Sequence, residues 1–133
     1  MITQIFIVED HQIVREALCM MLEMEEDMDV CGEADTGEEA LGAIAGAAPD
    51  LVLIDVSLPG MSGIELVERL IERHSGLRCL IVSGHREKQY AQQSLAVGAH
   101  GYIVKSSVID ELTAGIRQVM RGETYLSRSL RHL

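Results

Sequence analysis

Polar side chains follow four of the apolar segments of this chain, at the point where each segment ends. In chain order they are Glu9 with Asp10, Asp55, Ser83 and Lys105. Carboxylates, a hydroxyl and an ammonium gathered in one place can bind a hard cation and accept a phosphoryl group on a carboxylate. A buried carboxylate without such a role is costly because it loses its hydration, so Asp55 has to be paired, bound to a metal or catalytic.

The segments that carry these groups alternate with segments of helical periodicity. Strands are expected at residues 5–8, 28–34, 51–54, 79–82 and 102–104, and helices at residues 11–23, 36–47, 62–73, 87–97 and 109–121. The run at 51–54 has no polar residue, which is typical of a strand buried on both faces of a parallel sheet. The alternation predicts an α/β doubly wound fold with right-handed helical crossovers. Because the carboxyl ends of parallel strands share one edge, the polar groups are expected in one pocket.

The helix expected at residues 36–47 has a clear start and a weak interior. Thr36 is the expected N-cap, and Glu39 follows it at the spacing of a capping box. Gly42 and Gly46 lie four residues apart, and each weakens a helix by about 1 kcal/mol relative to alanine. We interpret them as a short face packed on the sheet, with a close helix contact as the alternative.

The composition indicates one acidic globular domain. A chain of 133 residues is long enough for a single core, and its 11 basic against 21 acidic residues leave a net charge of −10. This charge disfavours nucleic-acid binding by the segment itself, and no apolar run is long enough to span a membrane. Cys19, Cys31 and Cys79 are dispersed, which predicts buried thiols in a reducing compartment. No signal peptide is evident, so a cytoplasmic location is expected.

The acidic groups of the predicted pocket imply a cation. Glu9, Asp10 and Asp55 would raise one another's pKa by repulsion unless a positive charge lies between them. Oxygen ligands with positions left for water suit Mg²⁺, with Mn²⁺ as a substitute. Beside the metal, Lys105 and Ser83 would contact the phosphoryl oxygens, so the predicted product is an aspartyl phosphate.

With these residues in place, the chain resembles the CheY-like receiver domains of two-component response regulators. The motifs that carry the resemblance are Val8-Glu9-Asp10, residues 53–63, Ser83, Gly98-Ala-His-Gly-Tyr102 and Lys105. Asp10-His11, residues 98–102 and residues 122–127 are most similar to the NarL/FixJ type, whose output domains are LuxR-type helix-turn-helix domains. The resemblance covers residues 5 to about 121. It implies a flavodoxin-like (βα)5 fold whose five-stranded parallel sheet has the order 2-1-3-4-5.

The resemblance also implies a role for each residue of the pocket. Asp55 would be the phosphoacceptor, with Lys105 and Ser83 holding the phosphoryl group. The implied metal ligands are Asp10, Asp55 and the backbone carbonyl of Ser57, with Glu9 acting through a metal-bound water. Tyr102 would be the switch aromatic that turns inward when Ser83 moves toward the phosphate. A core tyrosine without that role is the alternative.

The same resemblance implies the partners and the domain organisation. Residues 1–121 would be the receiver domain, and residues 122–133 would begin a linker to a DNA-binding domain absent from this chain. A sensor histidine kinase would supply the phosphate and dock near residues 11–15 and the loop after Lys105. A homodimer is allowed by the family pattern. Two residues depart from that pattern, because Ser106 and Gln12 stand where proline is frequent.

The expected function is a phosphoacceptor switch, which is not an enzyme in the ordinary sense, and three alternatives stand beside it. A stand-alone receiver or phosphorelay protein is the first alternative. A hydrolase with an aspartyl-phosphate intermediate usually carries a second aspartate where this chain has Ser57, and the chain has no room for a substrate cap. A scaffold that is never phosphorylated would not need the complete set of pocket residues. His85, on the rim of the pocket, either shapes water access or is an exposed loop residue.

Overall fold

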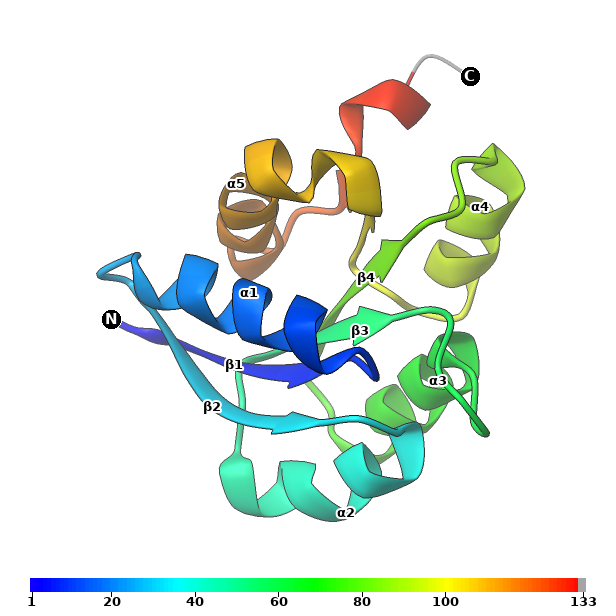
Figure 1. Cartoon of the computed structure of the whole chain (residues 1–133). Coiled ribbons are helices and arrows are strands. Elements are labelled where there is room, and N and C mark those ends of the chain that lie inside the picture. Colours follow the sequence, from blue (N-terminus) through cyan, green and yellow to red (C-terminus); the bar gives the residue numbers. More distant parts are fainter. Residues whose placement is uncertain (132–133) are drawn as a thin grey trace.

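A single parallel sheet of strand order β2-β1-β3-β4-β5-β6 organises the chain. The computed structural model describes residues 1–131 (Figure 1). The elements in chain order are β1 (Thr3–Val8), α1 (Gln12–Glu23), β2 (Met28–Ala34), α2 (Gly37–Ala47), β3 (Leu51–Asp55), α3 (Gly63–Arg73), β4 (Arg78–Ser83), α4 (Lys88–Ala96), β5 (Gly101–Val104), α5 (Val108–Met120) and β6 (Tyr125–Leu126). Two single turns of 3-10 helix, Lys105–Ser107 and Arg128–Leu130, complete the description.

The central strand β3 is buried on both faces, as its unbroken apolar run predicted. Leu51 and Leu53 pack in one core cluster, while Val52 and Ile54 pack in another on the opposite side of the sheet. This division follows from the period of two along a strand, which sends successive side chains to opposite faces. A strand that is apolar at every position therefore needs helices on both sides.

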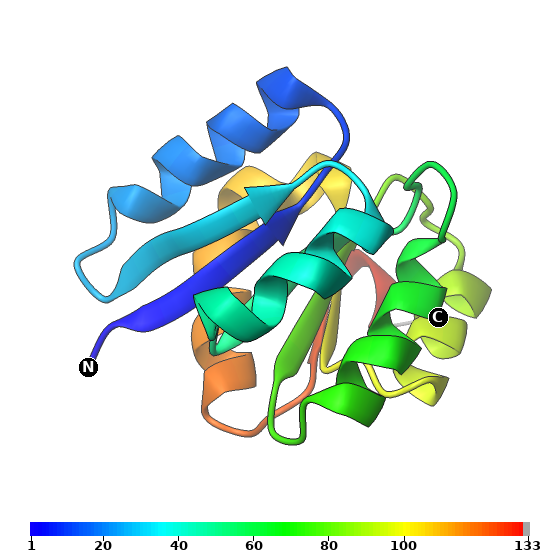
Figure 2. The same cartoon turned by 90° about the horizontal axis from the view of Figure 1, so that it is seen from below.

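The helices form two layers around the sheet. Helices α1 and α5 supply residues to the cluster that contains Leu51 and Leu53, and α2, α3 and α4 supply residues to the other cluster. Figure 1 shows α1 and α5 above the sheet and α2 and α3 below it, and Figure 2 shows α2 and α3 from below. The predicted α/β fold with a parallel sheet is confirmed.

The predicted number of strands was wrong by one, although the predicted order of the first five is observed. Strand β6 pairs in parallel with β5 at the edge of the sheet, in the segment that the sequence assigned to a linker. The last two residues of that predicted linker, 132–133, lie outside the described residues. A strand of two residues is too short to show an alternation of apolar and polar residues, so the sequence pattern does not predict it. It forms by pairing with β5.

The observed helix starts agree with those predicted from the sequence, but the surroundings of the two glycines in α2 differ from the prediction. The Thr36 hydroxyl accepts a hydrogen bond from the Glu39 backbone N–H at 3.1 Å, as expected of the N-cap. Gly42 and Gly46 are exposed, and no atom lies within 4 Å of the position a Cβ would take. Both interpretations of this pair, the face packed on the sheet and the close helix contact, were wrong.

The three cysteines differ in their surroundings, although none forms a disulfide. Cys79 is buried, as predicted, and burial raises the pKa of its thiol to about 12. Cys19 and Cys31 are half-buried, so the prediction of buried thiols was wrong for these two. Within residues 1–131, no helix combines the length and apolar character that crossing a membrane requires.

Gly63→Ala is expected to destabilise the protein by about 1–3 kcal/mol, through overpacking against a rigid backbone. A Cβ at this first residue of α3 would lie 2.6 Å from the Asp55 carbonyl oxygen and 2.7 Å from the Val56 Cα. Gly42→Ala is the matched control, because its Cβ would meet open space, and it should stabilise α2 by about 1 kcal/mol or less. Denaturant unfolding of both variants measures the difference. Equal stabilities would contradict the assigned close packing.

Candidate functional site

The register of the sheet places the predicted polar groups side by side at the carboxyl ends of the strands. Val8 pairs with Ile54, Asp55 pairs with Val82, and Ser83 pairs with Val104. Each polar residue named in the sequence therefore stands at or just beyond the last rung of its strand. The edge formed by the carboxyl ends of β1, β3, β4 and β5 carries the candidate site.

Lys105 joins two carboxylates from different strands. Its Nζ lies 3.2 Å from Asp55 Oδ2 and 3.4 Å from Glu9 Oε1, and both carboxylate side chains are only 2% exposed. Burial by itself would lower the pKa of Lys105, but the neighbouring Asp55 and Glu9 carboxylates raise it above its ordinary value. The ammonium is therefore a permanent positive charge in the site.

The carboxylates outnumber this single lysine. Burial raises the pKa of Glu9, and repulsion by Asp55 adds to the shift, while hydrogen bonding to His11 and the charge of Lys105 oppose it. The His11 ring nitrogen Nδ1 lies 3.1 Å from Glu9 Oε2 and 3.3 Å from Asp10 Oδ1. The carboxylates thus carry more negative charge than the Lys105 ammonium neutralises, which favours binding of a further cation.

The residues present fit a divalent metal ion. One ligand atom from each of Glu9, Asp10, His11 and Asp55 lies within 4.8 Å of the others. Asp10 Oδ1 is buried and, although His11 Nδ1 lies 3.3 Å away, it accepts no hydrogen bond from the described residues, which is unusual for a carboxylate oxygen. Carboxylate oxygens favour Mg²⁺ or Mn²⁺. Sequence reasoning missed the place of His11, although its position directly after the acidic pair was the available signal.

Ser57 contributes to the site through its backbone. Its N–H donates a hydrogen bond to Asp55 Oδ1 at 3.1 Å, which orients the carboxylate while Lys105 contacts the other oxygen. The role of the Ser57 carbonyl as a metal ligand stays a prediction. The same residue lies on an exposed part of the loop, so it is accessible to solvent.

The groups around Ser83 form a braced loop. Ser83 is fully buried, and its Oγ accepts a hydrogen bond from the His85 N–H at 3.0 Å. Tyr102 is also fully buried and donates from its hydroxyl to the His85 carbonyl oxygen at 2.8 Å, so its ring occupies the inward position. The His85 ring stacks on Tyr90 with 4.1 Å between centroids. His85 thus braces this loop, a role that neither sequence interpretation named, and its effect on water access stays a prediction.

The loop after Lys105 is tied to the loop after Ser83. Arg86 donates a hydrogen bond from Nη2 to the Ser106 hydroxyl at 3.0 Å. The peptide bond between Lys105 and Ser106 is trans, so the serine at this position does not require a strained bond. The departure from the family pattern at residue 106 therefore leaves the placement of Lys105 intact.

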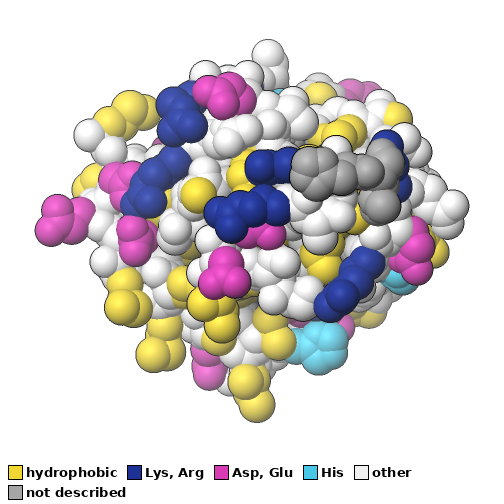
Figure 3. Space-filling model, turned by 90° about the horizontal axis from the view of Figure 1, so that it is seen from above, with side chains coloured by type: hydrophobic (Ala, Val, Ile, Leu, Met, Phe, Trp, Pro, Cys, Tyr) yellow, Lys and Arg dark blue, Asp and Glu magenta, His cyan; other side chains and the backbone are white. Residues whose placement is uncertain are grey.

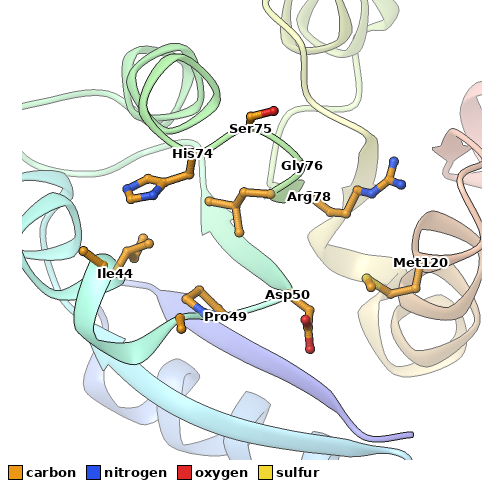
Figure 4. Close-up of a pocket in the computed structure, with 11 residues that line it drawn as sticks. Ile44, Pro49, Asp50, His74, Ser75, Gly76, Arg78 and Met120 are labelled. Atoms are coloured by element: carbon orange, nitrogen blue, oxygen red, sulfur yellow. The ribbon is translucent and has the colours of Figure 1, made fainter.

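A hollow lies near the amino ends of β3 and β4, away from the candidate site, and lacks that site's cluster of carboxylates. It has a volume of about 440 Å³ and is lined in part by Pro49, His74 and Arg78 (Figure 4). Its carboxylate, Asp50, accepts a hydrogen bond from the Gln4 N–H at 2.8 Å and so has a structural partner. The edge that carries Asp55 and Lys105 remains the stronger candidate for chemistry.

Comparison with known sequences agrees with the geometry. The response regulator receiver domain family matches residues 5–117. The transcriptional regulatory protein YvfU of Bacillus subtilis, itself uncharacterized, is 35% identical over 127 residues, covering 96% of this chain and 64% of that protein. The DNA-binding transcriptional activator DevR/DosR of Mycobacterium tuberculosis is 36% identical over 123 residues, covering 92% and 57%. The chain spans 55–64% of the length of such curated relatives.

A solved structure gives the same result. The LuxR-family two-component response regulator from Aurantimonas sp. SI85-9A1 superposes with a TM-score of 0.95 at 31% identity, covering 99% of this chain and 94% of the other. The family match spans nearly the whole of the described chain, and the fold and the acidic edge agree with it. This chain belongs to the response regulator receiver domain family and is a receiver domain of a two-component response regulator.

Proposed function

We propose that Asp55 accepts a phosphoryl group from a sensor histidine kinase and that the domain then changes conformation to control an output. The observation that carries this proposal is the placement of the Lys105 ammonium 3.2 Å from one oxygen of a nearly buried aspartate. An ammonium in that position would lie beside the phosphoryl oxygens during the transfer and stabilise their negative charge. A cytoplasmic location is part of the proposal, because the kinase and the transcription machinery act there.

The residues divide the work of the transfer. An Asp55 carboxylate oxygen forms the new bond to phosphorus, while the bond from phosphorus to the kinase histidine nitrogen breaks and leaves its electron pair on the imidazole. The Ser57 N–H holds Oδ1, and Lys105 contacts Oδ2 and the adjacent phosphoryl oxygens. Asp10, Asp55 and the Ser57 carbonyl would hold Mg²⁺, with Glu9 acting through a bound water, and the ion would supply charge neutralisation when bound. Phosphorylation and hydrolysis are self-catalysed, so this is a switch rather than a turnover enzyme.

The proposed output is transcription, through a domain outside this chain. DevR/DosR is a DNA-binding transcriptional activator, and this chain covers 57% of it. The net charge of −10 argues against DNA binding by the receiver itself, because phosphate contacts need basic side chains. Tyr102, packed inward against the loop after Ser83, is the proposed switch residue. Its hydroxyl donates a hydrogen bond to the His85 carbonyl oxygen in that loop, so a shift of the loop would change this contact.

An exposed apolar groove supports the proposed site of kinase docking. It runs along α1 and the start of α5, and is lined by Ile13, Val14, Ala17, Leu18, Met20, Met21, Met24, Val108 and Ile109. Ile13 is 82% exposed and Ile109 88% exposed. Figure 3 looks onto the α1 and α5 side of the molecule and shows hydrophobic side chains at its surface. Apolar side chains exposed together favour a protein partner. The kinase is the proposed partner, and a second copy of the chain is the alternative.

Incubation with acetyl phosphate and Mg²⁺ is expected to add one phosphoryl group to the protein. Intact-mass spectrometry detects the adduct, and Asp55→Asn should remove it because the nucleophile is gone. Asp29→Asn is the matched control, since Asp29 is exposed at the start of β2 and away from the site. An undiminished adduct on Asp55→Asn would rule out Asp55 as the acceptor.

Mg²⁺ is expected to stabilise the folded state, because only the folded chain brings Glu9, Asp10 and Asp55 together. A hundredfold excess over the dissociation constant should add about 2.7 kcal/mol to the free energy of unfolding. Thermal unfolding with and without Mg²⁺ measures this, with Mn²⁺ as a second ion. Asp10→Asn should lose most of the effect and Asp29→Asn should keep it. Equal stabilisation of both variants would place the ion elsewhere.

Ile13→Ser is expected to slow phosphotransfer from a kinase roughly fivefold or more, as loss of an interface anchor does. Its phosphorylation by acetyl phosphate should stay as in wild type, because Ile13 is outside the acidic site. The comparison uses any histidine kinase that phosphorylates the wild-type chain. Ile2→Ser is the control, because Ile2 is 51% exposed just before β1. If both variants receive phosphate from the kinase at the wild-type rate, the groove is not the docking site.

A further inference from the structure

Glu111 is a buried carboxylate that the proposed phosphotransfer does not use. It lies in the first turn of α5 and is only 3% exposed. Its Oε1 accepts hydrogen bonds from the Tyr125 hydroxyl at 2.6 Å and the Arg128 N–H at 3.0 Å, and its Oε2 accepts from the Ser127 hydroxyl at 3.4 Å. Burial would raise the pKa of Glu111, but the hydrogen bonds from the Tyr125 hydroxyl and the Arg128 N–H hold it below its ordinary value. An ionised carboxylate is thus kept inside the protein by the segment that follows α5.

Ser127 connects this cluster to strand β5. Its N–H donates to the Tyr102 carbonyl oxygen at 2.9 Å, and its Oγ accepts from the Val104 N–H at 2.9 Å. Ser127 is fully buried, so neither bond is replaced by water. Val104 is the last residue before Lys105. The serine therefore holds the part of β5 that leads directly into the lysine of the phosphoacceptor site.

The chain on the other side of Lys105 leads directly into α5, the helix that carries Glu111. Lys105–Ser107 form a single 3-10 turn, and the Val108 N–H donates a hydrogen bond to the Lys105 carbonyl oxygen. The main chain of Lys105 is consequently held through Val104 before it and by Val108 after it. A shift of the Lys105 backbone would break at least one buried hydrogen bond, and each such loss carries a penalty.

We propose that Ser127 and Glu111 are positioning residues for Lys105, which gives the buried serine that follows β6 a part in the phosphoacceptor site. This inference rests on the proposed function, because it concerns how the lysine meets the phosphoryl group. The coupling also acts in the opposite direction, from Lys105 to Ser127, because coupling between two sites is reciprocal. A change of contacts at Lys105 on phosphorylation loosens or tightens the hold of Ser127 on the segment after β6. The state of Asp55 thus reaches the chain beyond the sheet without passing through α4.

The first test measures the rate of phosphorylation by acetyl phosphate at saturating Mg²⁺, below the unfolding temperature of every variant. Ser127→Ala and Glu111→Gln should each be slower by roughly fivefold to tenfold, as the loss of one buried hydrogen bond allows. Ser127→Thr keeps the hydroxyl and should retain most of the rate. Ser129→Ala is the matched control, because Ser129 is exposed in the same segment. Wild-type rates in both Ser127→Ala and Glu111→Gln overturn the proposal.

The second test separates positioning from a loss of general stability. In a Lys105→Ala background, Ser127→Ala should cost no further rate, because the residue it positions is gone. The 19F spectrum of beryllofluoride bound with Mg²⁺ gives a readout that needs no turnover. Ser127→Ala should shift a bound fluorine signal in the direction that Lys105→Ala shifts it, and Ser129→Ala should not. A rate loss that is additive with Lys105→Ala, or an unchanged spectrum, overturns the positioning role. A wild-type chain that neither takes up phosphate nor binds beryllofluoride overturns the proposed function itself.

Discussion

The contact of the Lys105 ammonium with the carboxylates of Asp55 and Glu9 is the interaction on which the site depends. These groups come from three different strands, and both carboxylate side chains are 2% exposed. Charges so placed are tolerated only when their partners arrive in register. A slip of one residue in β3 would turn its side chains to the opposite faces and move Asp55 away from Lys105. The chemistry of the edge therefore requires the whole parallel sheet.

The demand for two-sided burial shapes the rest of the molecule. β3 is apolar toward both faces, so helices must cover both, and the chain supplies two on one side and three on the other. Helix α1 buries only Leu18 and Leu22 and leaves Ile13 and Met20 largely exposed, and Met24 at its C-cap is largely exposed as well. Apolar surface that the fold does not need for its own core is available for association.

The edge of the sheet next to β5 is closed by the chain itself. β6 pairs with β5, and Leu130 is buried in the core cluster that also contains Tyr102 and Val104. An uncovered edge strand would offer its N–H and C=O groups to other chains. Here the cover is fastened by the ionised Glu111 rather than by apolar contact alone. The backbone next to Lys105 and the end of the described chain consequently share one set of buried hydrogen bonds.

Local pattern predicted the five strand-helix units and the polar residues at the strand ends, because apolar periodicity and residue type are properties of the sequence itself. The order of the strands in the sheet was implied only by the resemblance to a known family. Strand β6 and the cluster around Glu111 were beyond that reach. Glu111 looks like a surface residue of an amphipathic helix, and Ser127 like part of a linker. The sequence by itself determined which groups meet at the sheet edge. Only the tertiary structure decided how Lys105 is held there, because buried hydrogen bonds between distant segments have no period along the chain.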